Sequence, residues 1–211
     1  MHLTVETTRQ PVTQTGLGGR QIHTGHADLG KSQFTGPGPY LGNELTAVEP
    51  HEAIVETRLL RDESATQALA AALAAQPAIR HAYIELHGEL GAGKTTFVRH
   101  LLHALGVAGR IKSPTYAVVE PHELPGLNIW HFDFYRFSDP REWEDAGFRD
   151  LFASTGLKLA EWPEKATGLL PLADLALTLQ VQPDESRMAT LKAQTPTGAT
   201  LLRSLPPEGR A

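Results

Sequence analysis

The sequence predicts an α/β fold with a largely parallel sheet, because short apolar runs typical of strands alternate with segments of helical periodicity. The clearest unit is residues 82–87, an apolar run that ends at a glycine-rich turn and is followed by helical spacing over 97–105. Two further strand-like runs, 128–132 and 157–160, lie on either side of another helical segment. The chain has 211 residues, 41 % hydrophobic and 20 % charged, which suits one globular domain with a sizeable core.

The first predicted elements are a strand and a helix that begin near Ala53. Apolar residues over 54–60 indicate the strand. Asp62 then provides a cap for a helix over the alanine-rich run 65–75. Gly106 is expected to end the helix that follows the glycine-rich turn, because glycine is favoured just after a helix C-terminus.

The second half of the chain predicts one more helix and a hairpin. The stretch 139–142 combines a capping aspartate, a proline at the first helical position and a capping-box glutamate, which predicts a helix to about Phe152. Residues 173–181 and 188–193 predict two antiparallel strands, turned around residues 183–185. The fold is therefore expected to end in a C-terminal hairpin.

Residues 1–50 differ in composition from the rest of the chain. They are rich in glycine, threonine, glutamine and histidine, hold few large apolar residues, and contain the Gly-Pro-Gly-Pro run 36–39. Such a segment buries too little apolar surface to offset its ordering entropy. We therefore expect a disordered or extraneous extension over 1–50, a single domain over 51–205 and a short tail over 206–211.

Composition and charge exclude several classes of protein. The chain has no cysteine, which excludes disulfides and thiolate metal sites. No apolar run approaches the roughly 20 residues of a membrane span, and residues 1–10 lack a secretory signal, so a cytoplasmic location without a membrane partner is expected. The formal net charge of −5 does not favour tight binding to nucleic acid. DNA is therefore not expected as a partner, and RNA only indirectly.

Residues 88–95 carry a phosphate-binding motif, since they fit G-x-x-x-x-G-K-[ST] at every fixed position. The glycines let the backbone curl so that successive N–H groups face a phosphate, Lys94 neutralises the β- and γ-phosphate oxygens, and the Thr95 hydroxyl ligates Mg²⁺. With a strand before it and a helix after it, the motif predicts a P-loop nucleoside triphosphatase of three layers. The residues expected to contact the nucleotide here are Glu89, Leu90, Gly91, Ala92, Gly93, Lys94, Thr95 and Thr96.

Two acids follow predicted strands at the edge where this fold places its ligand. Asp133 comes after the strand 128–132 and Glu161 after the strand 157–160. In such a place a carboxylate holds magnesium, directly or through water, or orients the attacking water. The alternative from the residues alone is that each acid caps a helix or pairs with an arginine such as Arg136.

The nucleotide and the reaction class are partly decided by missing motifs. No Asn/Thr-Lys-x-Asp motif for guanine follows Lys94, which favours ATP. An ABC-type signature is also missing, and the ordered part is short for a AAA+ protein. A compact ATPase remains, with a small-molecule P-loop kinase as the alternative, since Arg136, Arg141 and Arg149 could clamp a phosphoryl group. A nucleotide-gated binding module without turnover is the third class.

Four blocks in order resemble one known family, the TsaE (YjeE) family of bacterial ATPases. They are GELGAGKTTF at 88–97, KSPTY at 112–116, HFDFYR at 131–136 and EWPE at 161–164. The resemblance covers about residues 62–171. It implies a P-loop core with added antiparallel strands that binds ATP and Mg²⁺ and is required for the threonylcarbamoyladenosine modification of tRNA.

The same resemblance implies partners and roles for individual residues. The threonylcarbamoyl transfer would occur on TsaD, in a hetero-complex with TsaB, while this chain would be the ATP hydrolase that resets or drives the cycle. Thr95 and Glu161 look like magnesium ligands, and Asp133 looks like a second essential acid near the γ-phosphate. Thr115 belongs to the segment 113–115, which occupies the place of a phosphate-sensing switch. The expected catalytic residues are thus Lys94, Asp133 and Glu161.

Overall fold

The computed structural model describes residues 54–207, which form a seven-stranded sheet with helices. The strands are β1 (Val55–Leu60), β2 (Tyr83–His87), β3 (Val119–Leu124), β4 (Leu127–Asp133), β5 (Leu157–Glu161), β6 (Leu175–Val181) and β7 (Arg187–Ala193). The helices are α1 (Glu63–Ala74), α2 (Lys94–Leu105), α3 (Pro140–Asp145), α4 (Phe148–Ala153) and α5 (Pro196–Arg203), with short 3₁₀ helices η1 (Pro77–His81) and η2 (Pro163–Ala166). The predicted extension at 1–50 lies outside the described residues, as do residues 208–211.

The sheet is parallel at its centre and antiparallel at both edges. Its strand order is β1-β7-β6-β2-β5-β4-β3. The four central strands β4, β5, β2 and β6 run parallel, whereas β3 on one side and β7 and β1 on the other are antiparallel to their neighbours. All five residues of β5 are buried, as expected for a strand covered on both faces. The predicted fold class is confirmed, including the added antiparallel strands and the hairpin of β6 and β7.

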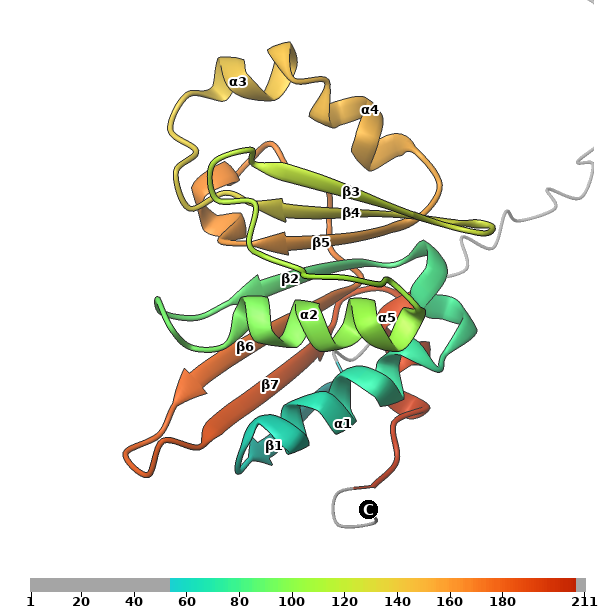
Figure 1. The fold of residues 1–211 in the computed structure, drawn as a ribbon, viewed down its shortest axis with the longest axis vertical. Coiled ribbons are helices and arrows are strands. Elements are labelled where there is room, and N and C mark those ends of the chain that lie inside the picture. Colours follow the sequence, from blue (N-terminus) through green and yellow to red (C-terminus); the bar gives the residue numbers. More distant parts are fainter. Residues whose placement is uncertain (1–53, 208–211) are drawn as a thin grey trace, which may run out of the picture. The chain divides into compact units, whose positions relative to one another are not determined.

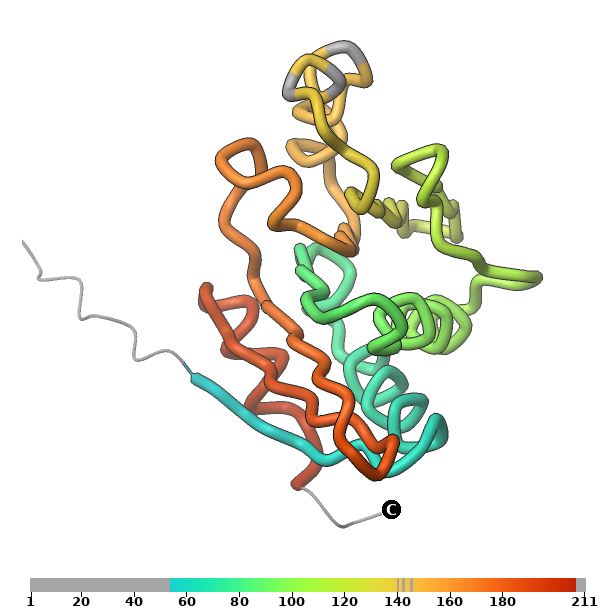
Figure 2. The backbone as a smooth tube through the Cα atoms, turned by 90° about the vertical axis from the view of Figure 1, so that its left-hand side faces the viewer, coloured from blue at the N-terminus to red at the C-terminus, as the bar shows by residue number. Residues whose placement is uncertain are grey.

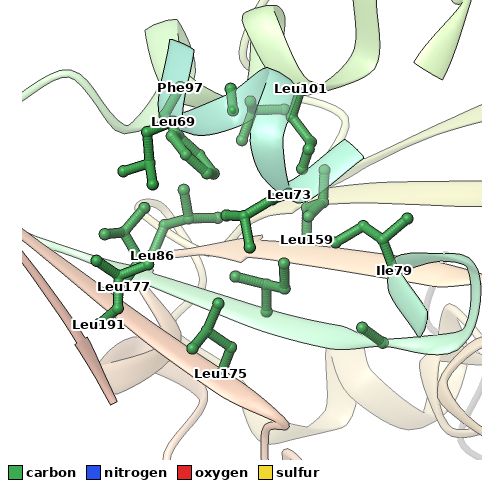
Figure 3. Packing of buried hydrophobic residues seen from close by; sticks show 14 of the residues in the cluster. Leu69, Leu73, Ile79, Leu86, Phe97, Leu101, Leu159, Leu175, Leu177 and Leu191 are labelled. Atoms are coloured by element: carbon green, nitrogen blue, oxygen red, sulfur yellow. The ribbon is translucent and has the colours of Figure 1, made fainter. Parts of the chain in front are cut away.

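Helices α1 and α2 lie side by side over one face of the sheet (Figure 1). The apolar core lies between them and the strands, and Figure 3 shows Leu69 and Leu73 of α1 with Phe97 and Leu101 of α2. These side chains are essentially removed from water, and each contributes about 1.5–3 kcal/mol of hydrophobic stabilisation. This core fixes the position of α2, whose first residues carry the phosphate motif.

An aromatic cluster covers the other face of β2, β5 and β4. Phe132 of β4 packs edge-on against Phe148 of α4, with ring centroids 5.7 Å apart. Phe134 and Trp143 belong to the same cluster. Residues alternate between the two faces of a strand, so Phe132 points into this cluster while its neighbours His131 and Asp133 face the opposite side, toward α2. The aromatic cluster thereby sets which side chains of β4 reach the candidate site.

Local chemistry explains where the first helices begin and end. Asp62 caps α1, since its Oδ1 accepts the Ala65 N–H at 2.9 Å. Helix α2 starts after Gly93 and stops at Gly106, both with left-handed φ angles, 108° and 105°. The predicted cap and the predicted stop signal are both confirmed.

The first strand of the described chain pairs with the last one. In Figure 2, β1 at the cyan end of the described chain runs along the red β7.

Three features differ from the sequence prediction. The single helix expected to run to Phe152 is wrong: α3 and α4 are separated around Gly147, which adopts a left-handed conformation with φ 66°. Strand β3 was not predicted, because it is polar and pairs only through its contact with β4. Helix α5 was not predicted either; it packs against β7 and η1. None of the helices described is long and apolar enough to cross a membrane.

Candidate nucleotide site

The glycine-rich loop between β2 and α2 takes a path that only glycine tolerates at several points. Gly88, Gly91 and Gly93 have φ angles of 134°, 80° and 108°. Residues with a side chain rarely adopt these φ angles, whereas glycine adopts them at no steric cost. Gly88 also lies so close to β6 that a Cβ there would be 2.4 Å from the Leu179 carbonyl oxygen. The loop is therefore seated on the neighbouring strand as well as on α2.

Lys94, the first residue of α2, is buried within this loop and only 4 % exposed. Its ammonium group donates to the carbonyls of Gly88 at 2.6 Å and Glu89 at 2.9 Å, and lies 3.8 Å from the centre of the Trp162 ring. Burial lowers the pKa of Lys94, while the nearby carboxylates, Glu161 foremost, oppose that shift. The lysine thus occupies the loop where the motif predicts a phosphate.

Glu161, at the carboxyl end of β5, forms the centre of a hydrogen-bonded chain. It is 2 % exposed. The Thr95 hydroxyl donates toward both of its carboxylate oxygens at 2.9 Å, and Nε2 of His131 lies 2.9 Å from Oε1. The two residues predicted as magnesium ligands, Thr95 and Glu161, are thus in direct contact.

Asp133, at the carboxyl end of β4, is held by three donors. The hydroxyls of Ser113 and Thr115 both donate to its Oδ2, the latter at 2.7 Å, and the Tyr135 N–H donates to Oδ1 at 2.9 Å. The segment 113–115, predicted as a switch, therefore contacts the acid predicted to lie near the γ-phosphate. In the parallel register Asp133 is paired with Glu161.

These groups line one cavity of about 300 Å³. The lining residues are Leu90, Gly91, Gly93, Lys94, Thr95, Thr96, Ser113, Thr115, Asp133, Tyr135, Glu161 and Trp162. Two of the predicted contact residues do not line it. Ala92 lines a neighbouring cavity of about 120 Å³ with Asp62 and Arg187, and Glu89 contributes its backbone carbonyl to Lys94. The structure brings the other predicted residues together.

The family model for "Threonylcarbamoyl adenosine biosynthesis protein TsaE" matches residues 60–189. The chain belongs to the TsaE family. Members of this family are involved in threonylcarbamoyladenosine biosynthesis.

Individual relatives agree with this membership. A TsaE protein of Haemophilus influenzae is 44 % identical over 119 residues, which is 56 % of this chain and 75 % of that protein. A TsaE protein of Bacillus subtilis is 34 % identical over 110 residues, or 52 % of this chain and 68 % of that protein. The crystal structure of Bacillus subtilis YdiB shares the fold, with a TM-score of 0.59 and 24 % identity over 73 % of this chain and 95 % of that one.

The oxygen donors of this TsaE-family site fit a magnesium ion shared with a nucleotide. Among the side chains that the structure describes, no group of three or more His, Asp or Glu residues is arranged to hold a metal by itself. Mg²⁺ is usually bound by one or two protein oxygens, water and substrate phosphates rather than by an all-protein cage. Thr95, the residue after Lys94, and Glu161 bring two such protein oxygens together.

Sequence reasoning missed two residues of the site. His131 contacts Glu161, and Tyr135 lines the cavity with its ring 5.1 Å from that of Trp162. Both residues stand in the block 131–136. The alternation of β4 gave a usable signal for His131, because residues 131 and 133 must share a face of the sheet.

Proposed function

We propose that this chain is a magnesium-dependent ATP hydrolase that acts in forming threonylcarbamoyladenosine in tRNA. It works with proteins of the TsaB and TsaD type, and its hydrolysis drives or resets their cycle while the transfer itself takes place on the TsaD-type partner. Contact with tRNA is indirect. Family membership supports the pathway. One observation supports the chemistry: Lys94, Thr95, Asp133 and Glu161 converge on one cavity at the glycine loop.

Different residues of the cavity have different roles in hydrolysis. Backbone N–H groups of the loop and the α2 N-terminus bind the phosphates, and Lys94 exchanges its carbonyl partners for phosphate oxygens. Thr95 and Glu161 would hold magnesium, which would supply positive charge to neutralise the β- and γ-phosphates. Asp133, kept in place by the hydroxyls of residues 113 and 115, orients the attacking water.

The kinase alternative has less support from the geometry. A P-loop kinase needs arginines in the cavity to clamp a transferred phosphoryl group, and none lines it in the described part of the chain. Arg136 lies over the Tyr116 ring at 4.7 Å, and Arg141 pairs with Asp139 at 2.7 Å. Arg149 lines a different cavity, beside α4.

The test is steady-state ATP hydrolysis by the purified chain, alone and with the matching TsaB–TsaD complex. We expect slow hydrolysis alone, clear stimulation by the complex, and a loss on the order of a hundredfold or more in Lys94→Ala and Glu161→Gln. Glu123→Gln, an exposed acid of β3, serves as the matched control and should keep the full rate. Phosphate transfer to a small molecule in place of water would instead identify a kinase. Repeated rounds of tRNA modification with Glu161→Gln would indicate a binding module that does not need hydrolysis.

A further inference from the structure

His131 is a buried histidine that contacts Glu161, a predicted metal ligand. It is 0 % exposed, and its Nε2 lies 2.9 Å from Oε1 of Glu161. The register of β4 and β5 pairs His131 with Leu159, two pairs before Asp133 and Glu161 and therefore on the same face of the sheet. His131 therefore approaches the carboxylate from the sheet, whereas Thr95 approaches it from α2.

The two ring nitrogens of His131 have unequal environments. A carboxylate oxygen only accepts, so Nε2 must carry the hydrogen and donate it to Glu161. The other nitrogen, Nδ1, is buried without a hydrogen-bond partner among the described residues. An unpaired buried polar atom costs free energy that a phenylalanine or leucine would not incur. The contact with Glu161 is what accounts for an imidazole at this position.

Thr95 and His131 hydrogen-bond the Glu161 carboxylate from two different sides. Thr95 is itself a predicted magnesium ligand, so its hydroxyl would have to serve the cation as well as the carboxylate. The N–H of His131 comes from a different element and remains available. Partners that hydrogen-bond a metal-ligating carboxylate fix its orientation and typically change metal affinity or activity by about 10–100-fold when removed.

We propose that His131 is a positioning residue that holds the Glu161 carboxylate ready for a divalent cation. This inference rests on the proposed magnesium–nucleotide function and adds a residue to it. Its signature is selective: loss of the N–H weakens nucleotide binding only when Mg²⁺ is present, because metal-free binding depends on the glycine loop and Lys94.

The test measures binding of a fluorescent ATP analogue to the full-length chain, in EDTA and across a Mg²⁺ titration. His131→Phe keeps the bulk of the side chain and removes the donor. His131→Gln places an amide N–H near the position of Nε2, whereas His131→Asn reaches only the position of Nδ1. His122→Phe on β3 is the matched control, since its Nε2 is likewise buried without a partner among the described residues but belongs to the next strand.

We expect the Mg²⁺ concentration for half-maximal tightening to rise about tenfold in His131→Phe and His131→Asn. It should stay near the wild-type value in His131→Gln and His122→Phe, and metal-free affinity should be equal in all of them. An unchanged Mg²⁺ dependence in His131→Asn would overturn the proposal. So would a rise in His131→Gln as large as that in His131→Asn. If His131→Phe does not fold, the comparison of His131→Asn with His131→Gln still tests the proposal. Failure of the wild-type chain to bind the analogue at all would reject the proposed function itself.

Discussion

Replacing Gly88 by alanine tests whether contact with β6 sets the path of the phosphate loop. An added Cβ would lie 2.4 Å from the Leu179 carbonyl oxygen and 3.2 Å from the Ala92 Cβ. The Leu179 carbonyl is strand backbone: Leu179 is in register with Ala189 of β7, and the preceding residue, Thr178, is in register with His87 of β2. It cannot retreat without disturbing the sheet. The loop would have to lift away from β6 instead.

The expected cost follows from two separate terms. Gly88 has φ 134°, and a side chain held in such a sparsely populated region costs about 1–3 kcal/mol. Overpacking of a close contact adds about 1–3 kcal/mol, which gives about 2–6 kcal/mol in total. Gly91→Ala is the matched control, because Gly91 has φ 80° in the same loop but nothing within 4 Å of its added Cβ. Its cost should be only the left-handed backbone term, about 1–2 kcal/mol.

The assay is urea and thermal unfolding of the full chain, followed by circular dichroism. Each kcal/mol lowers Tm by about 2–4 °C in a chain of this size, so Gly88→Ala should melt several degrees below Gly91→Ala. We also expect Gly88→Ala to lose affinity for nucleotide, since a lifted loop no longer presents its N–H groups. Equal free energies of unfolding in the two variants would refute the claim that β6 holds the loop.

Three further predictions concern single side chains around the site. Burial lowers the pKa of His122 below its ordinary 6.5, while Glu120 partly opposes the shift. As the pH falls through 6.5, the imidazole therefore binds a proton more readily in the unfolded chain than in the folded one. The free energy of unfolding of the wild type should therefore decrease as the pH is lowered through 6.5, and urea unfolding should show a smaller decrease in His122→Phe. Trp162→Phe should abolish the change in tryptophan emission on adding ATP and Mg²⁺, because Trp162 stands in the cavity over Lys94; persistence of the change would place its source elsewhere. Thr95→Val should leave metal-free nucleotide binding intact but weaken Mg²⁺-dependent binding by at least about tenfold, as titration with a fluorescent analogue would show.

The parts of the fold that could be predicted are those with local chemical signals. The cap at Asp62, the strand-loop-helix around Lys94 and the stop at Gly106 each depend on a few neighbouring residues. The apolar run of β5 likewise identifies a buried strand without knowledge of its neighbours. The sequence therefore places Glu161 and Asp133 at strand ends, although it does not show that the two residues are paired.

The parts that could not be predicted depend on distant contacts or on a single weak signal. Strand β3 contains Pro121 and alternates between partly buried and exposed residues; such a sequence becomes a strand only at an edge, where a missing N–H is tolerated. Gly147 interrupts an otherwise helical pattern, and isolated glycines do not always do so. Helix α5 did have a readable signal: Thr195 caps it by accepting the Gly198 N–H at 3.3 Å, with Pro196 next in the chain.

The register of β4 and β5 explains the electrostatic character of the site. It makes Asp133 and Glu161 direct partners, 3 % and 2 % exposed, although like charges opposite one another are unfavourable. The chain surrounds them mainly with hydroxyls, a backbone N–H and one imidazole, while Lys94 is the lysine close to both. Among the described residues of the cavity, one ammonium group thus stands opposite two carboxylates, which leaves negative charge that hydrogen bonds stabilise but do not neutralise. Such a site gains most from a ligand that brings a cation to the acids and phosphates to the lysine together, which supports a nucleotide bound with magnesium over either one alone.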